Sequence, residues 1–296
     1  YRTDKYEQPE TDFPTDVRTM ALQGDTLWIG SLNGLYTYQL NTKKLASLDS
    51  KSNGLPHHTI YSIIRTTDNQ IYVGTYNGLC RYIEESGKFE NIPLPVNRSV
   101  SNLFVNSLLE DTSRQCIWIG MEGSLFQYTP ATGLMKPIDA FHNNSIKSLA
   151  LDGDGNLLAG TDNGLYVYQN DNGTLQHIVH DSRNIQSLTN NIIWNIFADQ
   201  EQNIWLGTDY GISLSRYNSA LQFIPISQIT GTGDGNQFYS LFRDSKGFYW
   251  FGGTNGVIRF TNPTGNKHDA VWYRMGDKHH PLSHNRIRHI YEDREQ

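Results

Sequence analysis

The chain contains 296 residues, of which 37% are hydrophobic and 12% aromatic, and it carries a formal net charge of −6. This composition allows a substantial buried core and excludes an intrinsically disordered protein. No apolar run approaches the roughly 18–20 residues that span a bilayer, and the net negative charge argues against nucleic acid as a partner, because nucleic acid requires clustered cations.

The first predicted elements lie in residues 17–38. VRTMALQ (17–23) predicts a short strand, and LWIGSLNGLYTY (27–38) predicts a β-hairpin whose turn contains Asn33-Gly34. An Asn-Gly pair favours a type I′ turn, in which both central residues have positive φ. The same dipeptide recurs further along the chain, at Asn77-Gly78, Asn163-Gly164 and Asn255-Gly256.

The strand and the hairpin are repeated along the whole chain. Further hairpins are predicted at 71–82, 117–128, 157–168, 204–217 and 249–260. Further first strands are predicted at 60–66, 105–111, 146–152, 193–199, 238–244 and 287–293. A weaker fourth strand follows the hairpin, for example at 88–94 and 221–227. Four short strands in about 45 residues, with no helical periodicity, indicate the blade of a β-propeller.

The sequence therefore predicts an all-β fold, a single β-propeller domain over 1–296 with four-stranded blades and six full repeats. The glycines that mark the repeats lie 40 to 47 residues apart: Gly30, Gly74, Gly120, Gly160, Gly207 and Gly252. Residues 286–296 are expected to be the first strand of a further blade, and residues 1–16 the outer strand of the same blade. The intact protein is then expected to be a longer polypeptide with a seven-bladed propeller.

Some positions repeat in every blade and are interpreted as structural. One position holds Trp28, Trp118, Trp205 and Trp250, with Tyr72 and Leu158 in the other two blades. The glycine two residues later is expected to let a neighbouring backbone approach closely. Cys80 and Cys116 are interpreted as unpaired core thiols, because two cysteines without a CxxC motif provide no disulfide framework and no metal site.

One position differs from blade to blade and is the candidate binding site. The second residue of the successive first strands is Arg18, Tyr61, Asn106, Lys147, Trp194, Tyr239 and Arg288. The first strand lies innermost in a propeller, so these residues are expected to surround one mouth of the central channel. Aromatic faces combined with hydrogen-bonding groups suit a sugar. The alternative is that this position tolerates variety.

The loops before the first strands are expected to lie on the same face. They contain PHHT (56–59), HNNS (142–145), LTNN (188–191), GDGNQ (233–237) and LSHN (282–285). From these loops His57, His58, Asn190 and Asn191 are added as candidate ligand contacts.

No metal site, cofactor or catalytic residue is predicted. The loop histidines belong to different blades and do not converge as metal ligands must, which applies to His57, His58, His142 and His284 and to the pair His279-His280. DGDGN (152–156) lacks the downstream glutamate of an EF-hand and is interpreted as a turn between strands.

The pattern SI-x-ED-x-x-G-x-LWIGT-x-x-GL-x-x-Y, most complete at 105–128 and 191–217, resembles the two-component-regulator propeller repeat. Such repeats form the periplasmic sensor domain of Bacteroides-type hybrid two-component histidine kinases. The resemblance implies a periplasmic ectodomain of an inner-membrane protein that binds an oligosaccharide derived from a glycan. It also implies a homodimer in the full-length protein and downstream transmembrane and kinase modules that this chain lacks, so no catalysis is expected in this segment.

Two other classes of function stay open. A propeller lyase or hydrolase acting on a polysaccharide or a lactone could use His289 with Tyr291, or His57 with Tyr61, although no nucleophile elbow, HExxH motif or P-loop is present. A scaffold for protein–protein interaction would bind another protein and no small ligand.

Overall fold

The computed structural model describes residues 14–48, 50–95, 103–141, 144–169, 171–217, 223–225, 236–261 and 270–292. Predictions that concern residues 1–13, His142, 233–235 and 293–296 lie outside this part of the chain. The chain forms two compact units, one within Lys5–Ile146 and one within Lys147–Gln296. Among the described residues, no helix has the length and apolar character needed to cross a membrane.

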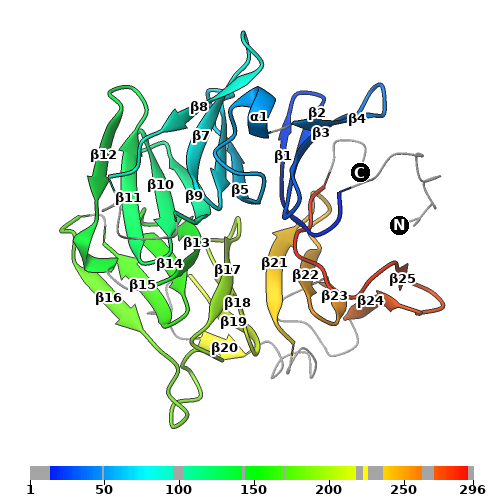
Figure 1. The fold of residues 1–296 in the computed structure, drawn as a ribbon. Coiled ribbons are helices and arrows are strands. Elements are labelled where there is room, and N and C mark those ends of the chain that lie inside the picture. Colours follow the sequence, from blue (N-terminus) through cyan, green and yellow to red (C-terminus); the bar gives the residue numbers. More distant parts are fainter. Residues whose placement is uncertain are drawn as a thin grey trace. The chain divides into compact units, whose positions relative to one another are not determined.

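The first unit contains three antiparallel sheets, and in each sheet the strands lie side by side in sequence order (Figure 1). The first sheet consists of β1 (Val17–Gln23), β2 (Thr26–Ser31), β3 (Leu35–Gln39) and β4 (Lys44–Leu48). The second consists of β5 (Ile60–Arg65), β6 (Ile71–Thr75), β7 (Gly78–Ile83) and β8 (Lys88–Ile92). The third consists of β9 (Val105–Asp111), β10 (Cys116–Met121), β11 (Ser124–Thr129) and β12 (Leu134–Pro137). One-turn helices, α1 (Ser50–Asn53) and η1 (Asp139–Phe141), lie outside the sheets.

The second unit repeats this plan in three further sheets. The fourth sheet consists of β13 (Ile146–Leu151), β14 (Leu157–Thr161), β15 (Gly164–Tyr168) and β16 (Leu175–Ile178). The fifth consists of β17 (Ile193–Ala198), β18 (Ile204–Thr208), β19 (Gly211–Ser215) and β20 (Phe223–Pro225). The sixth consists of β21 (Phe238–Arg243), β22 (Tyr249–Gly253), β23 (Gly256–Phe260) and β24 (Val271–Met275), with a short parallel fifth strand, β25 (Pro281–Leu282).

Apolar side chains of consecutive sheets pack face to face within each unit. In the first unit, Trp28 of β2 belongs to the same buried cluster as Ile60 of β5 and Val73 of β6. In the second unit, Trp205 of β18 shares a cluster with Phe238 of β21 and Phe251 of β22. The six sheets of the described chain are therefore β-propeller blades, which confirms the predicted fold class.

The glycine of each second strand provides the room for this packing. A Cβ atom at Gly30 would lie 2.6 Å from Ile60 Cγ2, and a Cβ atom at Gly160 would lie 2.6 Å from Ile193 Cγ2. At Gly207 the obstacle is backbone, because a Cβ atom would lie 2.6 Å from the carbonyl oxygen of Phe238. In each case the neighbour is the first residue of the next first strand. The predicted close approach of a neighbouring backbone is found at Gly207, whereas at Gly30 and Gly160 the close neighbour is a side chain.

The repeated tryptophans are structural, as predicted. Trp118 and Trp205 are almost completely buried, and their indole N–H groups donate to Asp111 and Asp199 at 3.0 and 2.8 Å. Trp250 is only half-buried but donates in the same way to Asp244, at 2.8 Å. The acidic residue at the end of a first strand therefore holds the tryptophan of the second strand.

The prediction of type I′ turns is wrong. None of Asn33, Asn77, Asn163 and Asn255 has positive φ. The register pairs Thr75 with Gly78, so the two central residues are Tyr76 and Asn77, and the glycine is the last residue of the turn. The buried Thr75 hydroxyl donates to the carbonyl of Gly78 at 2.9 Å and accepts the N–H of Asn77 at 3.1 Å. This side-chain bonding fixes the turn, whereas the sequence argument considered only the Asn-Gly pair.

Residues 286–292 have no strand partner in the described chain, but they contact the sixth blade as a first strand would. Ile287 packs on Gly252, and the N–H of Ile290 donates to Ser240 Oγ at 2.9 Å. Glu292 accepts from Ser245 N and Oγ at 2.8 and 2.9 Å, as Glu110 of β9 accepts from Thr67. The additional blade itself stays a prediction.

Cys80 and Cys116 are buried and free, as predicted. Burial raises the pKa of both thiols above its usual value, so neither is activated as a nucleophile.

We expect Gly30→Ala to lower the free energy of unfolding by about 1–3 kcal/mol, because the added methyl group overpacks the contact with Ile60. Chemical denaturation measures this loss. Ile60→Ala removes the nearest opposing atom, Cγ2, so the same glycine substitution should cost less in the Ile60→Ala background. Equal costs in the two backgrounds would contradict the steric explanation.

A pH dependence follows from His289, whose pKa is lowered by burial to about 4 from its ordinary 6.5. The folded chain keeps this imidazole neutral down to about pH 4, whereas the unfolded chain binds the proton near pH 6.5. The stability that depends on neutral His289 is therefore fully present above pH 6.5 and is lost as the pH falls toward 4, by about 3 kcal/mol at most.

Denaturant titrations of the wild type and His289→Gln at several pH values test this expectation. As the pH falls from 6.5 to 4, the wild type should lose stability relative to the variant. A difference that stays constant over this range would show that His289 does not resist protonation in the folded chain.

Candidate functional site

The variable position of the first strands coincides with a β-bulge. The pairing register between the first and second strands skips one first-strand residue in five blades, namely Arg18, Tyr61, Asn106, Trp194 and Tyr239. A bulged residue has no partner across the sheet, and its side chain is aimed away from the regular pleat. This explains why the position differs between blades, since sheet packing does not constrain it.

Four of the predicted residues form a continuous chain of contacts in the second unit. Lys147 Nζ lies 4.8 Å from the ring centroid of Trp194, and the rings of Trp194 and Tyr239 meet edge to face at 5.3 Å. The guanidinium carbon of Arg288 lies 3.8 Å from the ring centroid of Tyr239. The structure therefore brings these predicted residues together as two cations around an aromatic pair.

Hydrogen bonds at its indole N–H group fix the orientation of Trp194. Its indole N–H donates to Asp209 Oδ1 at 2.9 Å, and Gln237 Nε2 donates to the same oxygen at 2.6 Å. The hydroxyl of Tyr239 donates to Gln237 Oε1. The polar edge of Trp194 is thus already satisfied, and the half-buried indole can offer a ligand only its ring surface.

Tyr239 differs from Trp194 in its exposure. Tyr239 is only 8% exposed, and Arg288 covers one face of its ring. It therefore supports Trp194 by packing and is poorly placed to stack on a sugar.

The first unit contains a second group of aromatic contacts. Arg18 lies over the ring of Tyr61, with its guanidinium carbon 5.1 Å from the centroid. Tyr61 lies 5.7 Å from Phe104, which in turn meets Tyr76 at 4.1 Å. Asn106 occupies the bulge of β9 and is half-buried. The arrangement of all seven variable residues around one channel stays a prediction.

The sequence argument missed Phe104, Tyr76, Asp209 and Gln237. Tyr76 and Asp209 occupy the first central position of their hairpin turns, where the other blades have Leu32, Glu122, Asp162 and Thr254. This position varies as much as the bulge does. The search for positions at which the blades differ would have found these two residues if it had included the turns.

The predicted loop residues are engaged in shaping the loops. His57 Nδ1 accepts the N–H of Thr59 at 3.0 Å, and Asn190 Oδ1 accepts the N–H of Ile192 at 2.8 Å. Asn191 Oδ1 accepts the N–H of His180 at 2.6 Å. Each of the three residues therefore holds a loop in place.

The paired histidines are stacked, with the ring of exposed His58 4.2 Å from that of His57. Burial lowers the pKa of His57, and the neighbouring His58 adds to the effect. No group of three or more His, Cys, Asp or Glu residues in the described part of the chain could hold a metal ion.

Comparison with known proteins agrees with the repeat pattern. The sequence profile of a family described as two-component regulator propeller matches residues 54–77, 187–210 and 232–255. Histidine kinase P4 of Formosa agariphila is 30% identical over 278 residues, which cover 83% of this chain and 19% of that protein.

Solved structures include one close relative and one protein that shares only the fold. The extracellular domain of BT4673 from B. thetaiotaomicron, named as a hybrid two-component system, is 83% identical over 98% of this chain and 39% of that chain, with a TM-score of 0.69. Virginiamycin B lyase from Staphylococcus aureus has a TM-score of 0.67 but only 13% identity, over 89% of this chain and 86% of that chain, so this likeness shows the fold alone.

The chain spans about a fifth of the length of the histidine kinase and about two fifths of the solved extracellular domain. The matched profile, the repeats in register and these relatives all point to one family. The chain contains repeats of the two-component regulator propeller family and is similar to the extracellular domain of a hybrid two-component system.

Proposed function

We propose that the chain is part of the periplasmic ectodomain of a hybrid two-component sensor and binds a glycan-derived oligosaccharide at the bulge residues of its first strands. The extracellular location of the solved relative supports the compartment. The ligand, the compartment and the transmission of a signal are parts of this proposal.

The observation that carries the proposal is the environment of Trp194. This side chain is half-buried at a bulge, so the blade does not need it for sheet packing. Its N–H group is bonded to Asp209, and its ring lies beside the ammonium group of Lys147. A fixed apolar ring surface next to a hydrogen-bond donor suits a sugar, which stacks through its C–H face and bonds through its hydroxyl groups.

A ligand at this place would also connect several blades. Lys147 belongs to β13, Trp194 to β17, and Gln237 directly precedes β21. Binding can shift a signalling equilibrium only if the ligand has different affinities for two arrangements of the ectodomain. We expect a homodimer of the full-length protein to provide these arrangements, and the downstream domains of the same polypeptide to receive the change.

Binding is favoured over catalysis for His57 and Tyr61, one of the two pairs considered as catalytic candidates. His57 Nδ1 accepts a backbone N–H in its own loop, and the Tyr61 ring is covered on one side by Arg18. The similarity to the Staphylococcus lyase concerns the fold and assigns no chemistry to this chain. No observation on the described residues favours a protein scaffold over a ligand sensor.

Trp194→Ala is expected to weaken oligosaccharide binding at least tenfold, a loss of about 1.4 kcal/mol, because it removes the stacking surface. Isothermal titration calorimetry of the intact ectodomain against oligosaccharides released from plant and host glycans measures this effect. The midpoint of thermal unfolding should change little, since the side chain is half-buried and lies outside the sheet ladder.

Trp205→Ala is the matched control, because Trp205 is fully buried in the adjacent second strand. It should lower the free energy of unfolding by about 3–5 kcal/mol. Equal loss of stability in the two variants would remove the distinction between the bulge and the core positions. Absence of binding of every oligosaccharide to the intact wild-type ectodomain would overturn the proposed function.

A further inference from the structure

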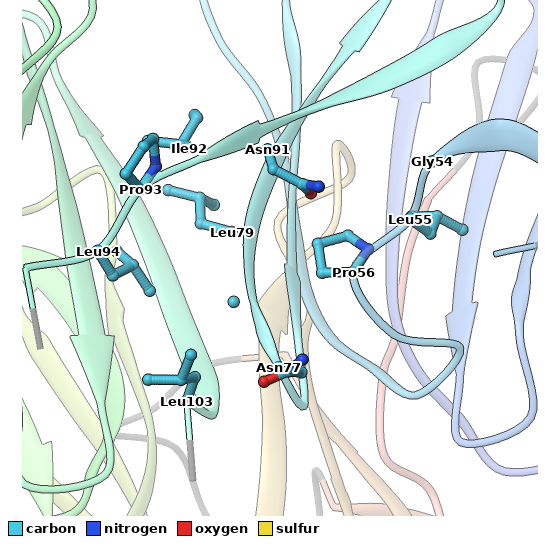
Figure 2. A pocket seen from close by; sticks show the side chains of 11 residues that line it. Gly54, Leu55, Pro56, Asn77, Leu79, Asn91, Ile92, Pro93, Leu94 and Leu103 are labelled. Carbon is cyan, nitrogen blue, oxygen red and sulfur yellow. The ribbon is translucent and has the colours of Figure 1, made fainter. Parts of the chain in front are cut away.

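A cavity lies in the first unit, beside the second blade. It is an open depression of about 530 Å³, lined by the loop before β5, the β6–β7 turn, β7 and the segments around β8 and β9. Figure 2 shows Pro56 on one side, Leu79, Leu94 and Leu103 on the opposite side, and Asn77 and Asn91 at the two ends. The size is within the range of about 300–1,000 Å³ of small-molecule sites.

The space beside Gly78 is open because the second blade lacks a contact that the fourth and sixth blades make. A Cβ atom added at Gly164 would lie 2.4 Å from the carbonyl oxygen of Ile178, the last residue of β16. The equivalent glycine of the sixth blade, Gly256, has the carbonyl oxygen of Tyr273 in the same place, at 2.2 Å. Around Gly78 there is nothing within 4 Å of such an atom. The space that the fourth strand fills in the fourth and sixth blades is therefore open in this blade.

Two prolines account for the divergence of the chain at this point. β8 ends at Ile92, which pairs with Leu79, and the sequence continues as Pro93-Leu94-Pro95. Proline has no N–H group for the sheet ladder and restricts the residue before it to extended conformations. The chain consequently leaves the edge of β7 after Ile92. At the equivalent point of the fourth blade, Ile178 is followed by Val179 and not by proline.

The chemistry of the lining is uncharged and mainly aliphatic. None of the eleven lining residues is acidic or basic. Leu79, Ile92 and Leu103 continue into the buried cluster between the second and third blades, so this wall is held rigidly. The polar side chains of the lining are the solvent-exposed amides of Asn77 and Asn91.

We propose that this cavity binds a neutral sugar unit that bears a methyl-terminated substituent, either an acetamido group or the methyl group of a 6-deoxy sugar. The methyl group would pack on the leucines, and each asparagine amide offers one donor group and one acceptor to the adjacent polar atoms. A charged ligand is disfavoured because no lining side chain could compensate its desolvation. The proposal rests on the proposed function in expecting a sugar, but it concerns a separate site with its own residues.

Methyl NMR spectra of the intact ectodomain, with labelled Ile and Leu, test this site. N-acetylglucosamine and D-fucose are the probes. The matched sugars are glucose, which has a hydroxyl group in place of the acetamido group, and D-galactose, which has a hydroxymethyl group in place of the methyl group. The methyl signals of Leu79, Leu94 and Leu103 should shift with the probes. Affinity for D-galactose should be roughly three- to tenfold weaker than for D-fucose, as expected for one buried methyl group, and affinity for glucose should be weaker than for N-acetylglucosamine. Whichever probe binds more tightly identifies the substituent.

Asn77→Ala and Asn91→Ala should each weaken probe binding at least fivefold. Asn163→Ala is the matched control, because Asn163 has the same turn position in the fourth blade, where the space beside the glycine is filled. Equal effects of Asn77→Ala and Asn163→Ala, or shifts confined to methyl groups outside the cavity, would overturn the proposal.

Trp194→Ala separates the two proposals. If this variant loses oligosaccharide binding while the cavity signals still shift with the probes, both sites are supported. Cavity shifts without any binding that depends on Trp194 would support the cavity and overturn the bulge site. Binding that depends on Trp194, without cavity shifts, would overturn the cavity alone.

Discussion

The contact between a second-strand glycine and the first residue of the next first strand is the constraint on which the other features depend. Ile60 and Ile193 are fixed by this contact, and the residue directly after each of them is released from the sheet ladder as a bulge. Because the fixed residue already sets the distance between blades, the bulged residue can change without loss of packing. An apolar residue fixed at one position thus leaves the next residue free to vary, as a binding site requires.

The same separation of roles explains the organisation of the candidate site. Trp205 and Trp194 lie in adjacent strands of one blade, yet the first donates to Asp199 within the core and the second to Asp209 at a hairpin turn. The core tryptophan stabilises the blade, whereas the bulge tryptophan is oriented by residues that vary between blades. Function on this scaffold can therefore change through bulges and turns while the sheets remain the same.

The fold could be predicted from the sequence because its determinants are local and repeated: the strand glycine, the tryptophan and the acidic residue recur in register. The turn geometry could not, since it depends on a hydroxyl group at the end of the second strand, such as that of Thr75. Lys147, Trp194, Tyr239 and Arg288 were predicted as one group and are in contact. Burial of Tyr239 and the cavity beside Gly78 could not be predicted, because they depend on neighbouring side chains and on where Pro93 directs the chain.

The attachment of residues 286–292 has a mechanical consequence. Its contacts with the sixth blade follow one another along the chain: Ile287 on Gly252, Ile290 on Ser240 and Glu292 on Ser245. A force applied from the C-terminal side of the segment would load the Glu292 contact first and the Ile287 contact last.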